Sequence, residues 1–421
     1  DWSSDVCSSD LLFPEAFGAM ALVTSIVVSL ALVSDTGIRQ AILQNPDDTD
    51  RRFLDTGWTL QLVRGVVLCA VAVALAPVAA GIFDSAELAV MLPIAALGLL
   101  IDGASPTREV LAQKRLAFRA PTVIDLAAQF GSIVAVIAAA AATESAVALA
   151  IGIPVASLLR VSLLHVVLAG VRDRPRIDRA AVGRFVTFGK WITLSTVCAM
   201  VVGHGDKYVF GAVLTAEAFG IYAIAFALAS IPRNFAFRLA GSVMIQSYKA
   251  AVDTPTPEAR ARLQAQRLKF TLGALGAIGV AGLIAPAFIG LAYDPRYALA
   301  GPMASLLCIA FLAETPGLTY QFAAIARGDT REAFWGNFMF SVLMVVGLVY
   351  GFWFGALIGA LLGQAVGALA GHVFRARIAY RHGAWDWRHD AAGLLGAAAL
   401  SAAIAWANRD TLAALSFDGF T

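Results

Sequence analysis

The sequence predicts an all-α integral membrane protein, and three observations carry this prediction. Of its 421 residues, 59% are hydrophobic and only 14% are charged, whereas soluble domains have roughly 45–50% apolar and about 25% charged residues. Twelve long apolar runs follow one another along the chain, and Lys and Arg gather in alternate connections between them. The composition excludes a disordered chain or a disulfide scaffold, and a net charge of +2 excludes a general basic bias toward nucleic acid.

The twelve apolar runs are each long enough to cross a membrane, because a bilayer core of about 30 Å needs about 20 apolar residues per helix. They are rich in Ala, Leu, Val, Gly and Phe and do not alternate, as the strands of a membrane β-barrel would. They are also longer than the strands of a parallel-sheet enzyme. We therefore expect membrane-spanning helices at 16–34, 58–80, 87–105, 121–142, 145–170, 187–213, 217–240, 268–290, 299–322, 333–353, 355–374 and 391–408.

The distribution of cations predicts the orientation of these helices. Of the 31 Lys and Arg residues, 25 are assigned to one alternating set of connections, and the other set holds only Arg296 and Arg409. Among the 25 are Arg233, Arg267 and Arg375, which we place in connections rather than in spans. Because cytoplasmic loops carry the excess of Lys and Arg, the first set is predicted to be cytoplasmic.

The two longest connections, 35–57 and 241–267, both fall on this predicted cytoplasmic side. In the connection 241–267, Thr256 is a residue type favoured at a helix N-cap, and Pro257 is a residue type favoured at the first helical position. We expect a short amphipathic helix on the membrane surface there.

An internal repeat indicates two similarly built halves. Glu-Ala-Phe-Gly occurs at 15–18 and again at 217–220, an offset of 202 residues in the same loop-to-helix context. In the second half the helix 187–213 precedes this motif, whereas the Ser/Asp-rich residues 1–10 stand where its partner should be. We expect residues 1–10 to be a foreign or mis-assembled segment in place of a first helix. The predicted organisation is an N-terminal lobe at 11–170 with five of six spans, a cytoplasmic linker at 171–184 and a C-terminal lobe at 185–380 with six spans. An additional span, which we expect to be truncated, follows at 381–421.

Several cations fall within or at the ends of predicted spans, where an ionisable side chain costs about 2.5–3.5 kcal/mol and needs a reason to be there. Arg160 lies ~15 Å from the cytoplasmic end of its helix at 1.5 Å per residue, so we predict that it points into a lumen. The alternative is a structural pair with an acid on a neighbouring helix. Arg64 and Lys190 lie nearer their helix ends and either line the lumen or snorkel to the interface.

A second group of charges includes candidates for ion coupling. Asp206 and Lys207 form a buried pair if the helix 187–213 is continuous, which we favour, or lie in an outer loop if it ends at Val202. Asp125 and Glu314 lie near inner helix ends. Each either caps or pairs at the interface or binds a coupling proton or cation.

Other motifs give no sign of a metal, a cofactor or an ATPase. The four cysteines form no C-x-x-C pair and the five histidines show no H-E-x-x-H spacing. Gly183, Gly189 and Lys190 approximate a phosphate loop, but the spacing is one residue too long and Trp191 stands in place of Ser or Thr. Glycines at 355, 359, 363, 367 and 371, and at 273, 276, 279 and 282, are spaced as in close helix–helix contacts.

Longer segments resemble the polysaccharide-transport family of lipid-linked oligosaccharide flippases, in the multidrug/oligosaccharidyl-lipid/polysaccharide exporter superfamily. The resemblance runs from residue 11 to about 380, and the family's first helix is missing. The segments that carry it are PEAFG, SDTGIRQAILQ, FLDTGWTLQLVRGVVL, REVLAQKRLAFRAPTVIDLAAQFGS, DKYVFGAVLTAEAFGIYAIAFALA and YDPRYALAGPMASLL.

The resemblance implies two six-helix bundles in a V around a central cavity. It implies alternating access that carries undecaprenyl-pyrophosphate-linked oligosaccharide outward across a bacterial inner membrane, with the native N-terminus cytoplasmic. The substrate-binding candidates are then Arg160, Arg64, Lys190 and Lys207. Asp206, Asp125 and Glu314 are candidates for ion coupling or gating. The resemblance implies the lipid-linked substrate, membrane lipids, and polysaccharide polymerase and chain-length machinery as partners, and no nucleic acid.

Two other functions remain open. A cation-coupled exporter of small drugs from the same superfamily would favour an acidic lumen. A membrane glycan polymerase or ligase would carry a sizeable outer loop with catalytic Arg or His, and the predicted outer loops are very short. We therefore predict a transporter rather than an enzyme.

Overall fold

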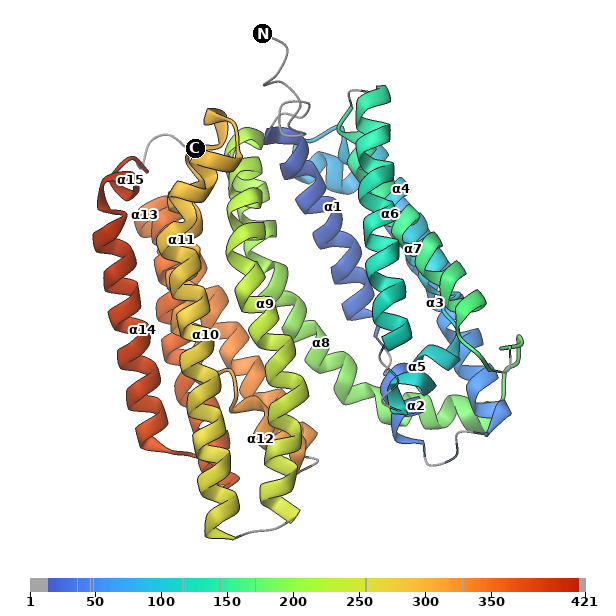
Figure 1. Ribbon diagram of the computed structural model, residues 1–421. Helices are drawn as coiled ribbons and strands as arrows, with labels where there is room; N and C mark the ends of the chain where they lie inside the picture. Colours follow the sequence, from blue (N-terminus) through green and yellow to red (C-terminus); the bar gives the residue numbers. More distant parts are fainter. Residues whose placement is uncertain are drawn as a thin grey trace. The chain divides into compact units, whose positions relative to one another are not determined.

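The computed structural model describes residues 14–415, apart from single positions 36, 46, 48, 116, 118, 144, 171 and 328 and the pair 254–255. Side chains at 44, 186–192, 195, 199, 242, 253 and 330 also lie outside the description. The chain divides into two compact units, unit 1 at residues 1–200 and unit 2 at 201–421. The division falls inside the long helix α8 (Arg179–Val213). The described part of each unit is built of helices and connections (Figure 1). The predicted segment 1–10 lies outside the described residues, and the lobe boundaries on either side of 171–184 stay a prediction.

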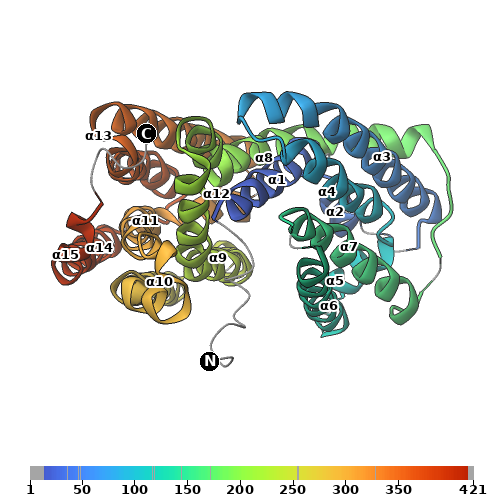
Figure 2. The ribbon, with the colours of Figure 1, turned by 90° about the horizontal axis from the view of Figure 1, so that it is seen from above.

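Unit 1 is organised around α4, which packs between α3 and α7 and also contacts α1 (Figure 2). Asp50 begins α3 by accepting a hydrogen bond from the backbone N–H of Phe53 at 3.1 Å. The axes of α4 and α5 differ by 63°. The helices of the unit are α1 (Pro14–Val33), α2 (Ile38–Gln44), α3 (Arg51–Ile82), α4 (Leu88–Asp102), α5 (Thr107–Lys114), α6 (Arg119–Thr143), α7 (Val147–Val167) and the first part of α8.

Unit 2 is organised around α11, which is buried along almost its whole length. Seen from above, α9, α10, α13 and α14 surround it (Figure 2), and all four contact it. The elements after α8 are α9 (Ala216–Asp253), α10 (Pro257–Ala292), η1 (Pro295–Tyr297), α11 (Ala300–Glu314), η2 (Thr315–Gly317), α12 (Gln321–Ala326), α13 (Thr330–Arg381), α14 (Trp387–Ala407) and α15 (Arg409–Ala413).

Helix α13 is a tight hairpin of two helical arms. The backbone leaves helical geometry at Gly355 and at Ala356, whose φ is 46°. A Cβ at Gly351 would lie 2.1 Å from the carbonyl oxygen of Gly359, and one at Gly347 would lie 2.1 Å from that of Gly363. The arms therefore touch backbone to backbone, which only glycine permits. This confirms the predicted close contact along the glycines of the second arm.

The second predicted glycine seam is only half correct. A Cβ at Gly279 would meet Leu400 of α14 at 3.0 Å, and one at Gly282 would meet Cys308 of α11 at 2.8 Å. At Gly273 and Gly276 no described atom lies within 4 Å of such a Cβ. Glycines three residues apart lie near one face of a helix, but only Gly279 and Gly282 pack against neighbouring helices.

All twelve predicted apolar runs lie on helices, which confirms a multi-pass, all-α membrane fold. Among the described residues, nine helical segments are long and apolar enough to cross a membrane, or ten if α4 and α5 form one bent span. That set counts the α13 hairpin once and does not include α8. The sequence prediction of twelve spans is higher because it counts the two arms of α13 as two spans and also counts α8.

The repeat stays a prediction, because the structure is described from Pro14, the first residue given for α1, whereas the start of α9 at Ala216 lies among described residues. The predicted long connection 241–267 is wrong. Instead of a loop with a short surface helix, α9 continues to Asp253 and α10 begins at Pro257 as one 36-residue helix. Thr256 does cap it, accepting from the N–H of Ala259 at 3.1 Å.

Candidate functional site

Arg160 is held by two carboxylates of unit 1. From α7, its Nη2 lies 2.8 Å from Oε1 of Glu109 on α5, and its Nε lies 2.8 Å from Oδ1 of Asp125 on α6. Glu109 is buried, whereas Asp125 is exposed. Asp102, at the end of α4, adds a third carboxylate that interacts electrostatically with Arg160. The surroundings of this arginine are therefore acidic, and the contacts match the alternative of a structural pair.

Arg64 of α3 binds the end of α1. Its Nε donates to the hydroxyl of Ser34 at 2.9 Å, and its Nη2 donates to the carbonyl oxygen of Ala31. Carbonyls at a helix C-terminus lack partners within their own helix and carry partial negative charge. Arg64 thus caps α1. No sequence pattern around Arg64 predicted this structural role. The side chain of Lys190, a further candidate, lies outside the described residues.

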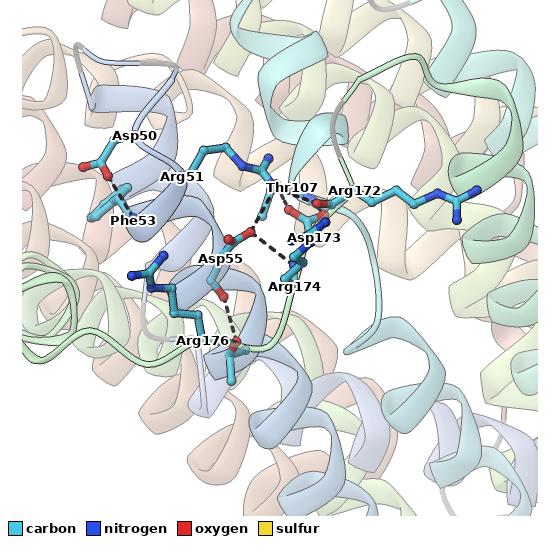
Figure 3. A network of polar contacts seen from close by, with 10 residues as sticks. Asp50, Arg51, Phe53, Asp55, Thr107, Arg172, Asp173, Arg174 and Arg176 are labelled. Carbon is cyan, nitrogen blue, oxygen red and sulfur yellow. Dashed lines mark hydrogen bonds and ion pairs between the residues drawn. The ribbon is translucent and has the colours of Figure 1, made fainter.

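The segment 172–178 of the predicted linker runs extended along unit 1 and is fastened to it by its backbone (Figure 3). The buried carboxylate of Asp55 accepts from the side chain of Arg51 and from the backbone N–H of Arg174, each at 3.2 Å. Thr107 donates through both its backbone N–H and its hydroxyl to the carboxylate of Asp173. Because its arginines are attached through their backbone atoms, their side chains remain exposed.

In unit 2, Asp206 and Lys207 lie buried inside the continuous helix α8, which confirms the favoured alternative. Nζ of Lys207 lies 3.7 Å from Oδ1 of Asp206 and 3.5 Å from the ring centre of Phe226 on α9. Oδ2 of Asp206 accepts a hydrogen bond from the hydroxyl of Tyr222. A cavity of about 180 Å³ adjoins Asp206 and Gln364 of α13. Asp206 Oδ1 and Gln364 Oε1 are buried without a hydrogen-bond donor among the described residues.

A second cluster centres on Glu314 at the end of α11. Its Oε2 accepts from Nε of Arg233 at 2.9 Å, and its Oε1 lies 4.0 Å from Nη1 of Arg375. Arg375 is buried over the ring of Phe340, 3.4 Å from its centre. Arg233 interacts electrostatically with both Arg375 and Lys207. Glu314 is therefore paired, and three cations face two carboxylates in the interior of this unit.

The sequence prediction placed Arg233, Arg267 and Arg375 in connections, and this is wrong. Arg233 lies in the middle of α9, Arg267 is fully buried in α10, and Arg375 is buried in the second arm of α13. The error arises because the helices extend beyond their most apolar windows. The position of Arg233 inside the apolar run 217–240 was a signal that could have placed it.

One group among the described residues has donor atoms close enough for a metal ion: Asp329, Glu332 and His382, at the two ends of α13. Nε2 of His382 lies 3.0 Å from Oε2 of Glu332, whose other oxygen lies 2.9 Å from Arg381. The arginine and the imidazole thus already share this carboxylate.

Comparisons with known proteins agree with this architecture. Residues 9–269 match the family described as "Polysaccharide biosynthesis protein". The lipopolysaccharide biosynthesis protein WzxC of Escherichia coli K12 is 21% identical over 339 residues, covering 79% of this chain and 68% of the relative. The teichuronic acid biosynthesis protein TuaB of Bacillus subtilis 168 is 26% identical over 205 residues, 48% of this chain and 42% of the relative.

Solved structures share the fold at low sequence identity. An inward-facing multidrug resistance MATE family transporter of the MOP superfamily has a TM-score of 0.65 at 14% identity, covering 93% of this chain and 92% of that chain. The lipid II flippase MurJ in an inward closed conformation has a TM-score of 0.60 at 12% identity, covering 94% and 90%. These likenesses show that the chain shares the helical fold of these two structures.

Proposed function

The chain belongs to the polysaccharide biosynthesis protein family, and we propose that it is an alternating-access flippase for undecaprenyl-pyrophosphate-linked oligosaccharide. In this proposal it moves the lipid from the inner to the outer leaflet of a bacterial cytoplasmic membrane, with the native N-terminus in the cytoplasm. The alternation of arginines supports that orientation. Glycan polymerase and chain-length machinery that use the exported lipid are the proposed partners. The protein would move its substrate without making or breaking a covalent bond.

The observation that carries the proposal is the excess of positive charge inside unit 2. Lys207, Arg233 and Arg375 share only Asp206 and Glu314 as counter-charges among the described residues. Charges in a membrane interior are costly unless paired or functional. A pyrophosphate supplies the missing negative charge, and guanidinium groups bind phosphate oxygens in pairs.

The sequence candidates take different places in this proposal. Lys207 is retained as a substrate-binding residue, together with Arg233 and Arg375, which the structure adds. The contacts of Arg160 and Arg64 favour positioning roles, since each is occupied by partners of its own unit. The role of Lys190 rests on the sequence alone.

A charge exchange separates substrate binding from structural pairing. Reconstituted protein would be assayed for flipping of a fluorescent lipid-linked oligosaccharide in liposomes, with Arg233→Glu, Glu314→Arg and the double exchange. The double variant keeps an ion pair at the same place, so a purely structural pair should regain full activity. We expect the double variant to fold but to remain at least tenfold slower, because the substrate now meets a carboxylate at position 233.

Arg409→Ala is the matched control, because Arg409 is exposed and its nearest carboxylate is the equally exposed Asp410 at 3.6 Å. It should flip at the wild-type rate. Wild-type activity in the double exchange would remove Arg233 from the substrate path. An inactive wild type with this lipid would count against the proposed substrate.

The acidic surroundings of Arg160 favour a second candidate, an exporter of cationic small molecules. Glu109, Asp125 and Asp102 outnumber the one guanidinium that they face. Efflux of a fluorescent organic cation from proteoliposomes, lost in Asp125→Asn, would support this candidate. We expect no such efflux by the wild type.

A further inference from the structure

Unit 2 contains a buried group of titratable residues that the proposed substrate site does not use. His372 comes from the second arm of α13, and His389 and Asp390 come from the first turn of α14. Tyr320, just before α12, and Arg267 of α10 complete the group, and His389, Tyr320 and Arg267 are almost fully buried. Ionisable groups at such depth in a transporter are expensive unless they have a function.

Asp390 is at the centre of the group and is held by neutral donors. Its Oδ1 accepts from the hydroxyl of Tyr320, and its Oδ2 accepts from Nε1 of Trp385 at 2.8 Å. Nε2 of His372 and Nδ1 of His389 lie 3.4 and 3.5 Å from Oδ1. Within the described part of the chain, the recorded ion pairs of this carboxylate are with these two imidazoles alone. It gains a full counter-charge only when one imidazole takes up a proton.

The two histidines differ in their freedom to take up that proton. Nε2 of His389 lies 2.9 Å from the hydroxyl of Thr271 and its Nδ1 lies 3.1 Å from that of Tyr320, so both nitrogens are engaged. Arg267 also interacts electrostatically with His389, and like charges repel. Neither ring nitrogen of His372 is hydrogen-bonded to a described residue, although both are buried. His372 is therefore the imidazole whose nitrogen near Asp390 is not engaged by another described residue.

Solvent reaches the edge of the group through a cavity. A cavity of about 390 Å³ lies at the end of unit 2 that the arginine distribution predicts to be cytoplasmic, and Tyr248 and Ala384 form part of its lining. Arg267 donates a hydrogen bond to the carbonyl oxygen of Ala384, so the wall of the cavity contacts the buried group at Ala384.

We propose that His372 and Asp390 form a proton-binding site that supplies the energy for transport. A proton bound at Nε2 of His372 creates an imidazolium–carboxylate pair that draws the second arm of α13 toward α14. Its release toward the cytoplasmic side, where the cavity lies, would return the helices and complete a cycle in which the proton moves inward while the lipid moves outward. Only this coupling step rests on the proposed function. The titratable or charged groups around the pair are Tyr248 of α9, Arg267 of α10, Tyr320 before α12, Arg375 of α13, and Asp386 and His389 at the start of α14.

The site itself is tested without substrate. The full chain in lipid nanodiscs would be melted at pH 6 and pH 8, as wild type and as His372→Gln, Asp390→Asn and the double variant. A histidine that gains a carboxylate partner stabilises the fold at the lower pH and loses that effect as pH rises. We expect the difference in melting temperature between the two pH values to shrink in each single variant, and by no more in the double one.

His165→Gln is the matched control, since His165 of α7 contacts a backbone carbonyl in unit 1 rather than a carboxylate. It should keep the wild-type difference. A wild-type difference in His372→Gln would overturn the site. So would fully additive effects in the double variant, because the two residues would then act independently.

Coupling is tested in liposomes with the lipid-linked oligosaccharide and an imposed pH difference. For one proton per lipid, one pH unit changes the equilibrium distribution between leaflets about tenfold. We expect that shift for the wild type and His165→Gln, and none for His372→Gln, which should still equilibrate the lipid. A tenfold shift in His372→Gln would refute coupling at this site. A wild type that moves no lipid would instead count against the proposed function, while the melting experiment would still decide whether the proton site exists.

Discussion

Removal of the charge at Glu314 gives the sharpest test of the buried cluster in unit 2. Glu314→Gln keeps the shape of the side chain but removes the carboxylate that Arg233 contacts at 2.9 Å and Arg375 approaches at 4.0 Å. Glu314 and Arg375 are buried, and Arg233 is only partly accessible. The two guanidinium groups would be left facing each other without a shared counter-charge.

The structure sets the size of the expected effect. At an effective dielectric constant of about 20, charges 2.9 and 4.0 Å apart attract by about 6 and about 4 kcal/mol. Much of this attraction offsets the cost of removing the charges from water, and loss of one partner of a buried pair costs about 3–5 kcal/mol in measured cases. We expect Glu314→Gln to lower the free energy of unfolding by about that amount. Adding Arg375→Met should recover part of it, because one stranded cation is gone.

The measurement is unfolding by SDS in mixed micelles, followed by helix content. Glu332→Gln is the matched control, because Glu332 is also 2.9 Å from an arginine, but Arg381 is more than half exposed. Exposed pairs contribute about 0–1 kcal/mol. A Glu314→Gln variant no less stable than Glu332→Gln would refute the reasoning that burial makes this pair decisive.

Three further outcomes follow from the fold. Gly351→Ala should prevent the α13 hairpin from closing and reduce the folded protein recovered from membranes, because its Cβ would lie 2.1 Å from the oxygen of Gly359; Gly273→Ala, next to open space, should be recovered normally. Asp55→Ala should weaken the attachment of segment 172–178 by about 1–3 kcal/mol, seen as faster cleavage there by trypsin in detergent. A single cysteine in segment 172–178 should resist a membrane-impermeant thiol reagent in intact cells. Labelling from outside would contradict the predicted cytoplasmic location of this segment.

The sequence predicted which segments are helices because membrane insertion depends mainly on local composition. An apolar run of about 20 residues has no low-energy alternative to a helix in lipid, where each backbone group must be satisfied internally. The Glu-Ala-Phe-Gly motif at 217–220 likewise predicted the start of α9, since it lies at the N-terminus of a long apolar run. Thr256 and Pro257 predicted a second start through local capping chemistry.

Helix ends and the partners of charged side chains could not be predicted in the same way. Hydropathy falls near Arg233 and Arg375, so both were assigned to connections, yet both lie inside helices. Whether such a residue faces lipid, water or a carboxylate depends on a helix far along the chain, as with Glu314, which lies 81 residues after Arg233.

The sequence by itself therefore determined that this is a multi-pass helical membrane protein, because that property follows from composition and local spacing. Tertiary structure alone decided that Arg160 is shared by two acids, that Arg64 caps α1, and that His372 approaches Asp390 across the join of α13 and α14. The physical reason is that the energy of a buried charge depends on the groups within about 4 Å of it. Those groups come from other helices, and no local pattern records them.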